Sequence, residues 1–181
     1  MYGLKFRETR IIRIIEESLS KLPRHDSIFI ELNASPDDEA VMMDHDQMVA
    51  VLMYLEQNAL DAMPDGGTLT ISVTGDERRI TLLLADTGKG IAEENMPLLF
   101  TPFFTTKPAG DGSGLGLPSA YATVKAHGGD IAIESNADAH KGPTGTTVRI
   151  SMPRRQGFQD KQAKIILHDD EDSDEPSDEL Y

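Results

Sequence analysis

The middle of this chain reads NALDA at residues 58–62, DTGKGI at 86–91, FTPFFTTK at 100–107 and GSGLGL at 112–117. Any one of these blocks alone is a weak signal, because short glycine motifs recur by chance. Their order is more informative, since each block offers a different chemistry. The four blocks are therefore interpreted together, as parts of one site.

The spacing of apolar residues around the blocks predicts a mixture of helices and strands. Helices are expected at residues 8–22, from 44 or 46 to about 63, and at 115–127. Strands are expected at residues 28–32, 40–43, 68–74, 79–85, 130–135 and 146–152. The predicted fold class is α+β: a two-layer α/β sandwich with a mixed, mostly antiparallel sheet covered on one face by about three helices.

Composition excludes several classes of protein. With no cysteine, neither disulfides nor a thiolate metal site can form. The net charge of −14 argues against nucleic-acid binding, because the phosphate backbone would be repelled. Charged residues close to the start and the lack of a long apolar run predict neither a signal peptide nor a membrane span. We expect a soluble protein of a reducing compartment.

The helix that contains the first block offers oxygen ligands. Asn58 and Asp61 are three residues apart and therefore share a helix face. The amide oxygen of Asn58 suits Mg²⁺, which prefers oxygen and completes its shell with waters and substrate phosphates. An isolated asparagine would more often bond to backbone. The interpretation as a metal ligand depends on the other blocks.

The second block follows a predicted strand and begins with a carboxylate. Asp86 can accept a hydrogen bond from the exocyclic amine of adenine, whereas guanine presents a carbonyl at that position. Gly88 and Gly90 lack a Cβ and would let the backbone approach the base. The alternative is an ordinary Asp-Thr-Gly turn without a binding function.

The third and fourth blocks lie in a stretch, 86–113, that has little periodicity. Loops of that length inside a compact domain are usually functional. The phenylalanines of FTPFFTTK can anchor the base of a lid, although core packing also explains them. The glycines of GSGLGL precede a helix whose exposed amides favour phosphate. Together the four blocks predict a pocket for Mg-ATP.

In this order the blocks resemble the N box, first glycine box, F box and second glycine box of the histidine kinase catalytic domain. That domain belongs to the Bergerat superfamily, which also includes gyrase and MutL. Residues 145–148, GTTV, resemble the closing Gly-Thr motif of the family. The DAMP and FTTK variants at 61–64 and 104–107 are most similar to the nitrogen-regulation type of sensor kinase. The resemblance extends over about residues 8–153.

The resemblance implies the Mg-ATP-binding catalytic domain of a two-component sensor histidine kinase, a cytoplasmic protein-histidine kinase in signal transduction. It implies Mg²⁺ as cofactor, held by Asn58, and ATP as the phosphoryl donor. The implied partners are a histidine-bearing dimerisation domain and, indirectly, a response regulator, with neither nucleic acid nor membrane contact. The ATP-binding residues implied by the motifs are Asn58, Asp61, Ala62, Asp86, Gly88, Gly90, Ile91, Phe104, Thr105, Thr106, Lys107, Gly112, Ser113, Gly114, Leu115, Gly116, Leu117 and Thr146.

The chain departs from the family pattern in two respects. Tyr54 stands where gyrase-like members carry a glutamate base and where many histidine kinases carry a first asparagine. Tyrosine cannot serve as a base at neutral pH, and Glu56 projects to another helix face. The phosphoacceptor box, a histidine followed by an acid, a basic residue and proline, is absent from the sequence. No residue of this chain is therefore identified as catalytic.

The expected organisation has three parts. Residues 1–24 would connect to a dimerisation and phosphoacceptor domain, residues 25–155 would form the ATP-binding domain, and residues 156–181 would form a flexible acidic tail. Within that tail, residues 164–171 faintly resemble the opening of a receiver domain. The alternative functions are a protein serine kinase of the anti-sigma type and a non-catalytic nucleotide-binding module. A hydrolysing clamp of the gyrase kind fits less well.

Overall fold

A computed structural model describes residues 3–23, 25–34, 40–108, 110 and 112–155 of the chain. Its main sheet has five strands in the order β2-β4-β5-β7-β6. These strands are β2 (Ile28–Ala34), β4 (Gly67–Gly75), β5 (Arg79–Asp86), β6 (Asp130–Asn136) and β7 (Gly145–Pro153). The pair β2–β4 is parallel, whereas β4–β5, β5–β7 and β6–β7 are antiparallel. The sheet is thus mixed and mostly antiparallel, as predicted.

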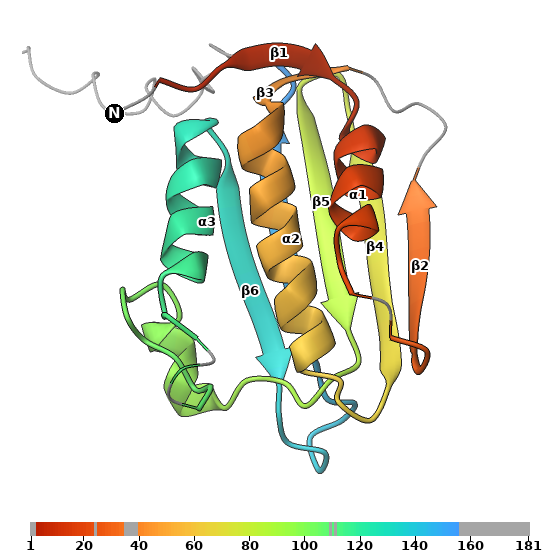
Figure 1. Ribbon diagram of the computed structural model, residues 1–181, viewed down its shortest axis with the longest axis vertical. Coiled ribbons are helices and arrows are strands. Elements are labelled where there is room, and N and C mark those ends of the chain that lie inside the picture. The colour runs from red at the N-terminus through yellow and green to blue at the C-terminus, as the bar shows by residue number, and fades with distance from the viewer. Residues whose placement is uncertain (1–2, 24, 35–39, 109, 111, 156–181) are drawn as a thin grey trace, which may run out of the picture.

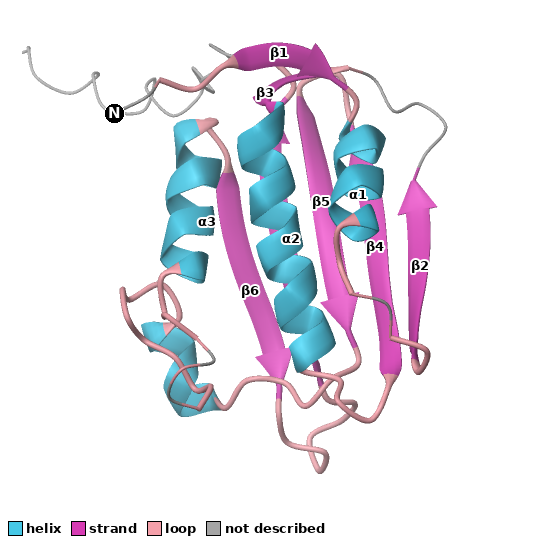
Figure 2. Cartoon of the chain, in the orientation of Figure 1, coloured by secondary structure: helices cyan, strands magenta, loops and turns pink. Residues whose placement is uncertain are grey.

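Three α-helices lie side by side on one face of this sheet (Figures 1 and 2). They are α1 (Ile11–Ser20), α2 (His45–Asp61) and α3 (Gly116–Ala126). A separate two-stranded antiparallel sheet, made of β1 (Phe6–Thr9) and β3 (Val41–Asp44), crosses one end of the helical layer. The predicted α+β sandwich with helices on one face is confirmed.

The core lies between the helices and the sheet. Strands β4 and β5 bury every second residue, as a half-buried strand should: Leu69, Ile71, Val73, Ile80, Leu82 and Leu84. The facing side of α2 buries residues at helical spacing: Met48, Val51, Leu52, Leu55 and Ala59. Ile11, Ile14 and Ile15 of α1 are 0% exposed, so this helix belongs to the same core.

Local signals explain where the central helix begins. Asp44 is its N-cap, and a carboxylate oxygen of Asp44 accepts a 3.2 Å hydrogen bond from the Gln47 N–H, an arrangement typical of an aspartate at the N-cap. His127, at the end of α3, is buried and accepts a 2.9 Å bond at Nε2 from the backbone N–H of Asp44. His127 therefore helps to fix the position where α2 begins.

The N-terminal prediction needs a correction. A helix was expected from Glu8, but α1 begins at Ile11, because Phe6–Thr9 pairs with β3 instead. The expected loop 86–113 also contains a 3-10 helix, η1 (Glu93–Leu98), which was not predicted. The acidic tail and its receiver-like segment, expected at residues 156–181, lie outside the described residues.

The topology brings the sequence blocks together. The C-terminal ends of α2, β5 and β6 and the N-terminal ends of α3 and β7 all point to the lower end of the molecule in Figure 1. Blocks that are far apart in sequence therefore meet at one end of the sandwich.

Among the described residues, no helix combines the length and the apolar character needed to cross a bilayer.

Candidate functional site

The loop after β5 is docked against the last turn of α2. Ala62 is the C-cap of this helix, and its carbonyl oxygen accepts a 3.0 Å hydrogen bond from the Lys89 N–H. A Cβ on Gly88 would lie 2.6 Å from the same oxygen, so only glycine permits this approach. Asn58, one turn earlier on α2, and Asp86, two residues before Gly88, consequently lie at the same end of the fold.

Asp86 is held at the end of β5 by two backbone groups. Its Oδ1 accepts hydrogen bonds from the N–H of Gly88 at 2.9 Å and from that of Thr146 at 3.2 Å. Partial burial raises the pKa of Asp86, and these two hydrogen bonds offset the rise only in part. Within the part of the chain that the structure describes, both bonds go to Oδ1, which leaves Oδ2 available to a ligand.

Thr146 belongs to a small hydroxyl network beside Asp86. The two residues face each other across β5 and β7. The Thr146 hydroxyl lies 2.9 Å from Oγ of Ser135, and that oxygen accepts a 2.8 Å bond from the Ile91 N–H. Ser135 was not predicted as a site residue. The sequence placed Ser135 at the end of a predicted strand, but it could not predict that Ser135 pairs with Thr146.

Asn58 and Asp61 both bind a lysine from the third block. Nζ of Lys107 lies 3.1 Å from Oδ1 of Asn58 and 2.5 Å from Oδ2 of Asp61. Gln57 donates a 2.8 Å bond to Oδ1 of Asp61. Partial burial alone would raise the pKa of Asp61, but the bonds from Lys107 and Gln57 outweigh it and hold that pKa below its usual value.

The third block forms a turn that is tied to the fourth. The N–H of Phe103 donates a 2.9 Å bond to the carbonyl of Gly114, and Phe103 itself has a positive φ of 68°. Its side chain is 74% exposed, so Phe103 does not anchor the loop as predicted. Phe100 does so instead, because it packs on the core and its ring centroid lies 5.0 Å from that of Tyr121.

The remaining residues of the third block lie close to Lys107. Thr105 accepts a 3.1 Å bond at its hydroxyl from the Lys107 N–H, while Thr106 is exposed. Phe104 is half-buried, and its N–H bonds to the carbonyl of Thr101 at 3.2 Å. The ammonium of Lys107 is thus on the side of the loop that faces α2.

The fourth block leads into α3. Ser113 accepts a 3.3 Å bond from the Leu115 N–H, and Leu117 packs against the core. Among the described residues, no side chain caps the start of α3, so its first amides can bind an anion. Gly116 packs so closely on the ring of Tyr54 that a Cβ at residue 116 would collide with that ring. The tyrosine thus forms a wall beside the start of the helix.

Glu56 is excluded from the site. It is 0% exposed, and its Oε1 accepts a 2.8 Å hydrogen bond from the Ser18 hydroxyl of α1. This agrees with the interpretation that Glu56 projects to a helix face other than that of Asn58. Neither Tyr54 nor Glu56 therefore provides a carboxylate base one turn before Asn58, and the carboxylate of Asp61 on this side of α2 is bound to Lys107.

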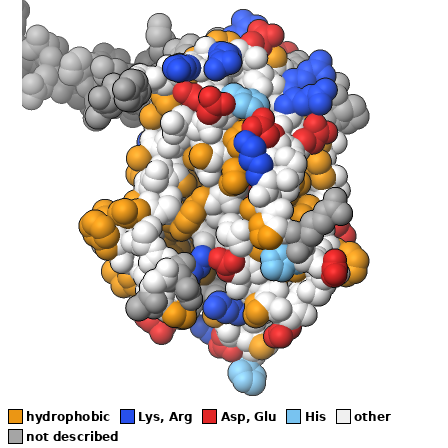
Figure 3. Space-filling model, viewed as in Figure 1, with side chains coloured by type: hydrophobic (Ala, Val, Ile, Leu, Met, Phe, Trp, Pro, Cys, Tyr) orange, Lys and Arg blue, Asp and Glu red, His pale blue; other side chains and the backbone are white. Residues whose placement is uncertain are grey.

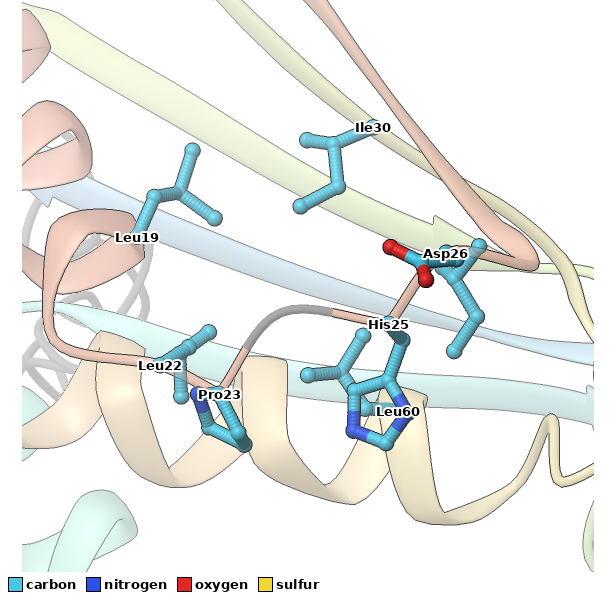
Figure 4. A pocket seen from close by; sticks show the side chains of 8 residues that line it. Leu19, Leu22, Pro23, His25, Asp26, Ile30 and Leu60 are labelled. Atoms are coloured by element: carbon cyan, nitrogen blue, oxygen red, sulfur yellow. The ribbon is translucent and has the colours of Figure 1, made fainter.

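A separate hollow of about 380 Å³ lies between α1, β2 and the last turn of α2. Figure 4 shows its lining, in which Leu19 of α1 and Ile30 of β2 lie on opposite sides, and Leu22, Pro23, His25, Asp26 and Leu60 complete the labelled side chains. None of the predicted site residues lines this hollow. The candidate site is instead at the lower end of the face seen in Figure 3, where acidic and basic side chains lie next to one another.

The arrangement has the parts of a nucleotide site. Asp86 offers a carboxylate oxygen beside a glycine backbone, the start of α3 offers free amides, and Asn58 and Asp61 offer two oxygens that already bind one cation, the ammonium of Lys107. Hard oxygen donors of this kind fit Mg²⁺, whose shell is usually shared with phosphates and water.

Comparison with known proteins gives a consistent result. Residues 43–156 match the family described as histidine kinase-, DNA gyrase B-, and HSP90-like ATPases. The chain is 34% identical over 128 residues to sporulation kinase A of Bacillus subtilis (strain 168), covering 71% of this chain and 20% of that protein. It is 33% identical over 151 residues to the sensor protein FixL of Bradyrhizobium diazoefficiens, covering 76% of this chain and 28% of that protein. The chain thus spans only 20% and 28% of the length of these two curated relatives.

Solved structures share the fold. The mycobacterial sensor histidine kinase MprB superposes with a TM-score of 0.72 at 28% identity, covering 83% of this chain and 99% of that chain. The catalytic domain of histidine kinase ThkA has a TM-score of 0.71 at 26% identity, with 83% and 99% coverage.

Proposed function

Because the chain belongs to the family of histidine kinase-, DNA gyrase B-, and HSP90-like ATPases, we propose that it is the Mg-ATP-binding catalytic domain of a two-component sensor histidine kinase. Its γ-phosphoryl acceptor is a histidine on a separate dimerisation domain. The observation that carries the proposal is the convergence of Asn58, Asp86 and the uncapped start of α3 at one end of the fold.

Adenine recognition falls to the end of β5. Oδ1 of Asp86 is fixed by Gly88 and Thr146, so its Oδ2 can accept a hydrogen bond from the exocyclic amine. A fixed acceptor discriminates strongly, since a base that presents a carbonyl there leaves two acceptors facing each other. The backbone around Gly90 and Ile91 completes this side of the pocket.

The phosphates belong between α2 and α3. Asn58 is the proposed metal ligand, and Mg²⁺ bound there with ATP would neutralise charge on the triphosphate. The first amides of α3, preceded by residues Gly112 to Leu115, bind phosphate oxygens at the positive end of the helix dipole. Thr105, Thr106 and Lys107 add two hydroxyls and a cation from the facing loop. These residues position the nucleotide, which is the main contribution of a protein to phosphoryl transfer.

The lack of a carboxylate one turn before Asn58 on α2 favours transfer over hydrolysis. Tyr54 packs on Gly116, and Glu56 is buried against Ser18, so neither can activate a water molecule in the pocket. The acceptor and the acid that assists it would come from the dimerisation domain of the parent kinase. A cytoplasmic location and a response regulator as the downstream partner complete the proposal.

Phosphoryl transfer tests the proposal directly. The chain is incubated with Mg²⁺ and γ-labelled ATP together with the dimerisation domain of its parent kinase, supplied separately. We expect label on a histidine of that domain, recognised because phosphohistidine is labile in acid and stable in alkali. The variant Asp86→Asn should give a much weaker signal at ATP concentrations that do not saturate it. Saturating ATP binding without any transfer would contradict the proposal.

One observation favours a second candidate, a nucleotide-binding module without catalysis. Tyr54 occupies a position from which a polar side chain could reach the phosphates, and its ring is instead committed to Gly116. Calorimetric titration of ATP and ADP with and without Mg²⁺ separates the two. Equal, metal-independent binding of both nucleotides, with no transfer, would support the module. Label that is stable in acid and lost in alkali would point to a serine kinase instead.

A further inference from the structure

The ammonium group of Lys107 lies between two oxygens of α2. Nζ is 3.1 Å from Oδ1 of Asn58 and 2.5 Å from Oδ2 of Asp61, and the lysine stands 46 residues beyond Asp61 in the chain. Oδ1 of Asp61 is already engaged by Gln57 at 2.8 Å. The two oxygens that point to Lys107 are thus the free oxygen of the carboxylate and the amide oxygen proposed as a metal ligand.

This arrangement resembles a small cation site that the chain fills with its own side chain. A carboxylate and an amide oxygen, converging on one point, are typical ligands of Mg²⁺. An ammonium donates hydrogen bonds to the same oxygens and carries the same sign of charge. Two cations cannot share these ligands at close range without strong repulsion. The lysine and a metal ion are therefore alternatives at this position.

We propose that Lys107 is a resident counter-ion of the metal site, which must leave Asn58 and Asp61 when a divalent cation arrives with its nucleotide. The inference rests on the proposed function and adds a regulation of the same site. Binding becomes an exchange of cations on α2. The displaced ammonium is then free to meet the negative charge that enters with the phosphates, so the charge of the pocket stays balanced.

The exchange couples the metal site to both phosphate-binding blocks. Nζ of Lys107 contacts α2, while its backbone N–H bonds to Thr105 at 3.1 Å. A Cβ on Gly112 would lie 3.3 Å from Cδ of Lys107 and 2.9 Å from the Thr105 hydroxyl, so the second glycine block packs on the same lysine stem. Movement of Lys107 away from α2 would consequently shift its contacts with both blocks. Lys107 is a positioning residue in this scheme.

Binding of Mn²⁺ without nucleotide tests the inference. Mn²⁺ is a paramagnetic probe for Mg²⁺ sites, and the free ion is counted by electron paramagnetic resonance. In Lys107→Met, the oxygens of Asn58 and Asp61 lose their cation, so we expect Mn²⁺ to bind about tenfold or more tightly than in the wild type. Lys107→Arg should restore weak binding, because its guanidinium can engage the same two oxygens.

Two further variants test whether the effect comes from the loss of a positive charge alone and whether Mn²⁺ binds at Asn58. Lys89→Met removes one positive charge from the same end of the fold, but Lys89 reaches α2 through its backbone N–H, so Mn²⁺ affinity should stay near that of the wild type. The double variant Asn58→Ala with Lys107→Met should lose the gain. Equal Mn²⁺ affinity in the wild type and Lys107→Met would overturn the inference.

A parallel titration of the wild type with Mg-ATP separates this inference from the proposed function. If Mg-ATP binds but the variants do not differ in Mn²⁺ affinity, the cation exchange alone is wrong. If the variants differ as expected but the wild type does not bind Mg-ATP, the proposed function fails, while Lys107 still occupies a cation site.

Discussion

The hydroxyl oxygen of Ser18 lies 2.8 Å from Oε1 of Glu56 and so joins α1 to α2 inside the core. The same hydroxyl lies 3.0 Å from the carbonyl oxygen of Ile15. One hydroxyl proton cannot fully serve both acceptors. If it goes to Ile15, the bond between Ser18 and Glu56 requires a proton on Glu56. Burial raises the pKa of Glu56 to about 7, and the bond from Ser18 lowers it only in part.

We expect stability to fall as pH rises through neutrality. A carboxyl whose pKa is higher in the folded chain, about 7 against 4.5, binds its proton more tightly there. Its contribution is therefore present at low pH and lost as pH rises through about 7. The loss should be about 2 kcal/mol between about pH 5 and about pH 8. Glu56→Gln, an analogue of the protonated form, should flatten this slope in urea unfolding.

Glu17 is the matched control for that experiment. It neighbours Ser18 on α1, and hydrogen bonds from Lys21 and His45 lower its pKa. A carboxyl whose pKa is lowered by folding contributes its stability at pH values above its ordinary pKa and loses it only in acid. The variant Glu17→Gln should therefore show the same fall in stability through neutral pH as the wild type. An unchanged slope in Glu56→Gln, with the wild-type fold retained, would show that Glu56 is not the titrating group.

A second prediction concerns selection of the base. In Asp86→Asn, the amide oxygen can still accept from Gly88 and Thr146, which leaves the amide N–H groups where the carboxylate Oδ2 had been. The amide N–H and the exocyclic amine of adenine are both donors and would face each other, so ATP affinity should fall about 10- to 100-fold. GTP, whose carbonyl now meets a donor, should lose much less. Calorimetry with both nucleotides measures the change in preference.

Asp65→Asn controls for the loss of a negative charge at the same end of the molecule. Asp65 is exposed in the turn after α2, and its variant should bind ATP as the wild type does. A fall in ATP affinity equal in Asp86→Asn and Asp65→Asn would mean that Asp86 acts only through its net charge. A parallel fall for GTP in Asp86→Asn would exclude direct readout of the base.

The parts of the site that end a regular element could be predicted from the sequence. Asn58 lies on a helix and Asp86 ends a strand, and the spacing of apolar residues predicts both elements. Both residues could therefore be assigned to their elements from the sequence. The contact of Lys107 with Asp61 could not be predicted, because a loop without periodicity carries no information about its own path. The short strand Phe6–Thr9 was missed for a related reason: its only sheet partner in the described residues is Val41–Asp44, far along the chain.

Side-chain exposure within the loop was equally hidden. Phe100 and Phe103 have the same side chain in the same block, yet one packs on Tyr121 and the other is 74% exposed. The difference comes from backbone geometry, since Phe103 has φ 68° and turns its side chain outward. Local composition does not encode a positive φ at a residue other than glycine.

A third prediction tests the turn that joins the third and fourth blocks. Gly114 has φ +65°, and a Cβ there would lie 2.6 Å from Cα of Phe103. Gly114→Ala should displace this turn and weaken ATP binding about tenfold, by the strain of a left-handed residue and by the collision. Gly110, with φ +102° and open space around it, provides the control. Gly110→Ala carries backbone strain without the collision, so its ATP affinity should change less; equal losses in the two variants would contradict the argument.

The fourth prediction concerns how closely α3 approaches α2. A Cβ on Gly116 would collide with the ring of Tyr54, so Gly116→Ala in the wild-type background should lower the free energy of unfolding by about 1–3 kcal/mol. Removing the ring in Tyr54→Ala vacates the space that the new methyl group needs. Alanine in a helix is more stable than glycine by about 0.5–1 kcal/mol. The same substitution should therefore become neutral or stabilising once Tyr54 is alanine.

A double-mutant cycle measures this reversal of sign. Urea unfolding of the wild type, the two single variants and the double variant gives a coupling energy, which should exceed about 1 kcal/mol because the two side chains occupy one space. Additive effects of Tyr54→Ala and Gly116→Ala would mean that α3 can shift away from the ring at little cost. In that case the contact between Tyr54 and Gly116 yields easily, and Tyr54 does not fix the position of the phosphate site. A strong coupling instead means that the aromatic ring at this position of α2 sets the distance between the two helices that hold the triphosphate.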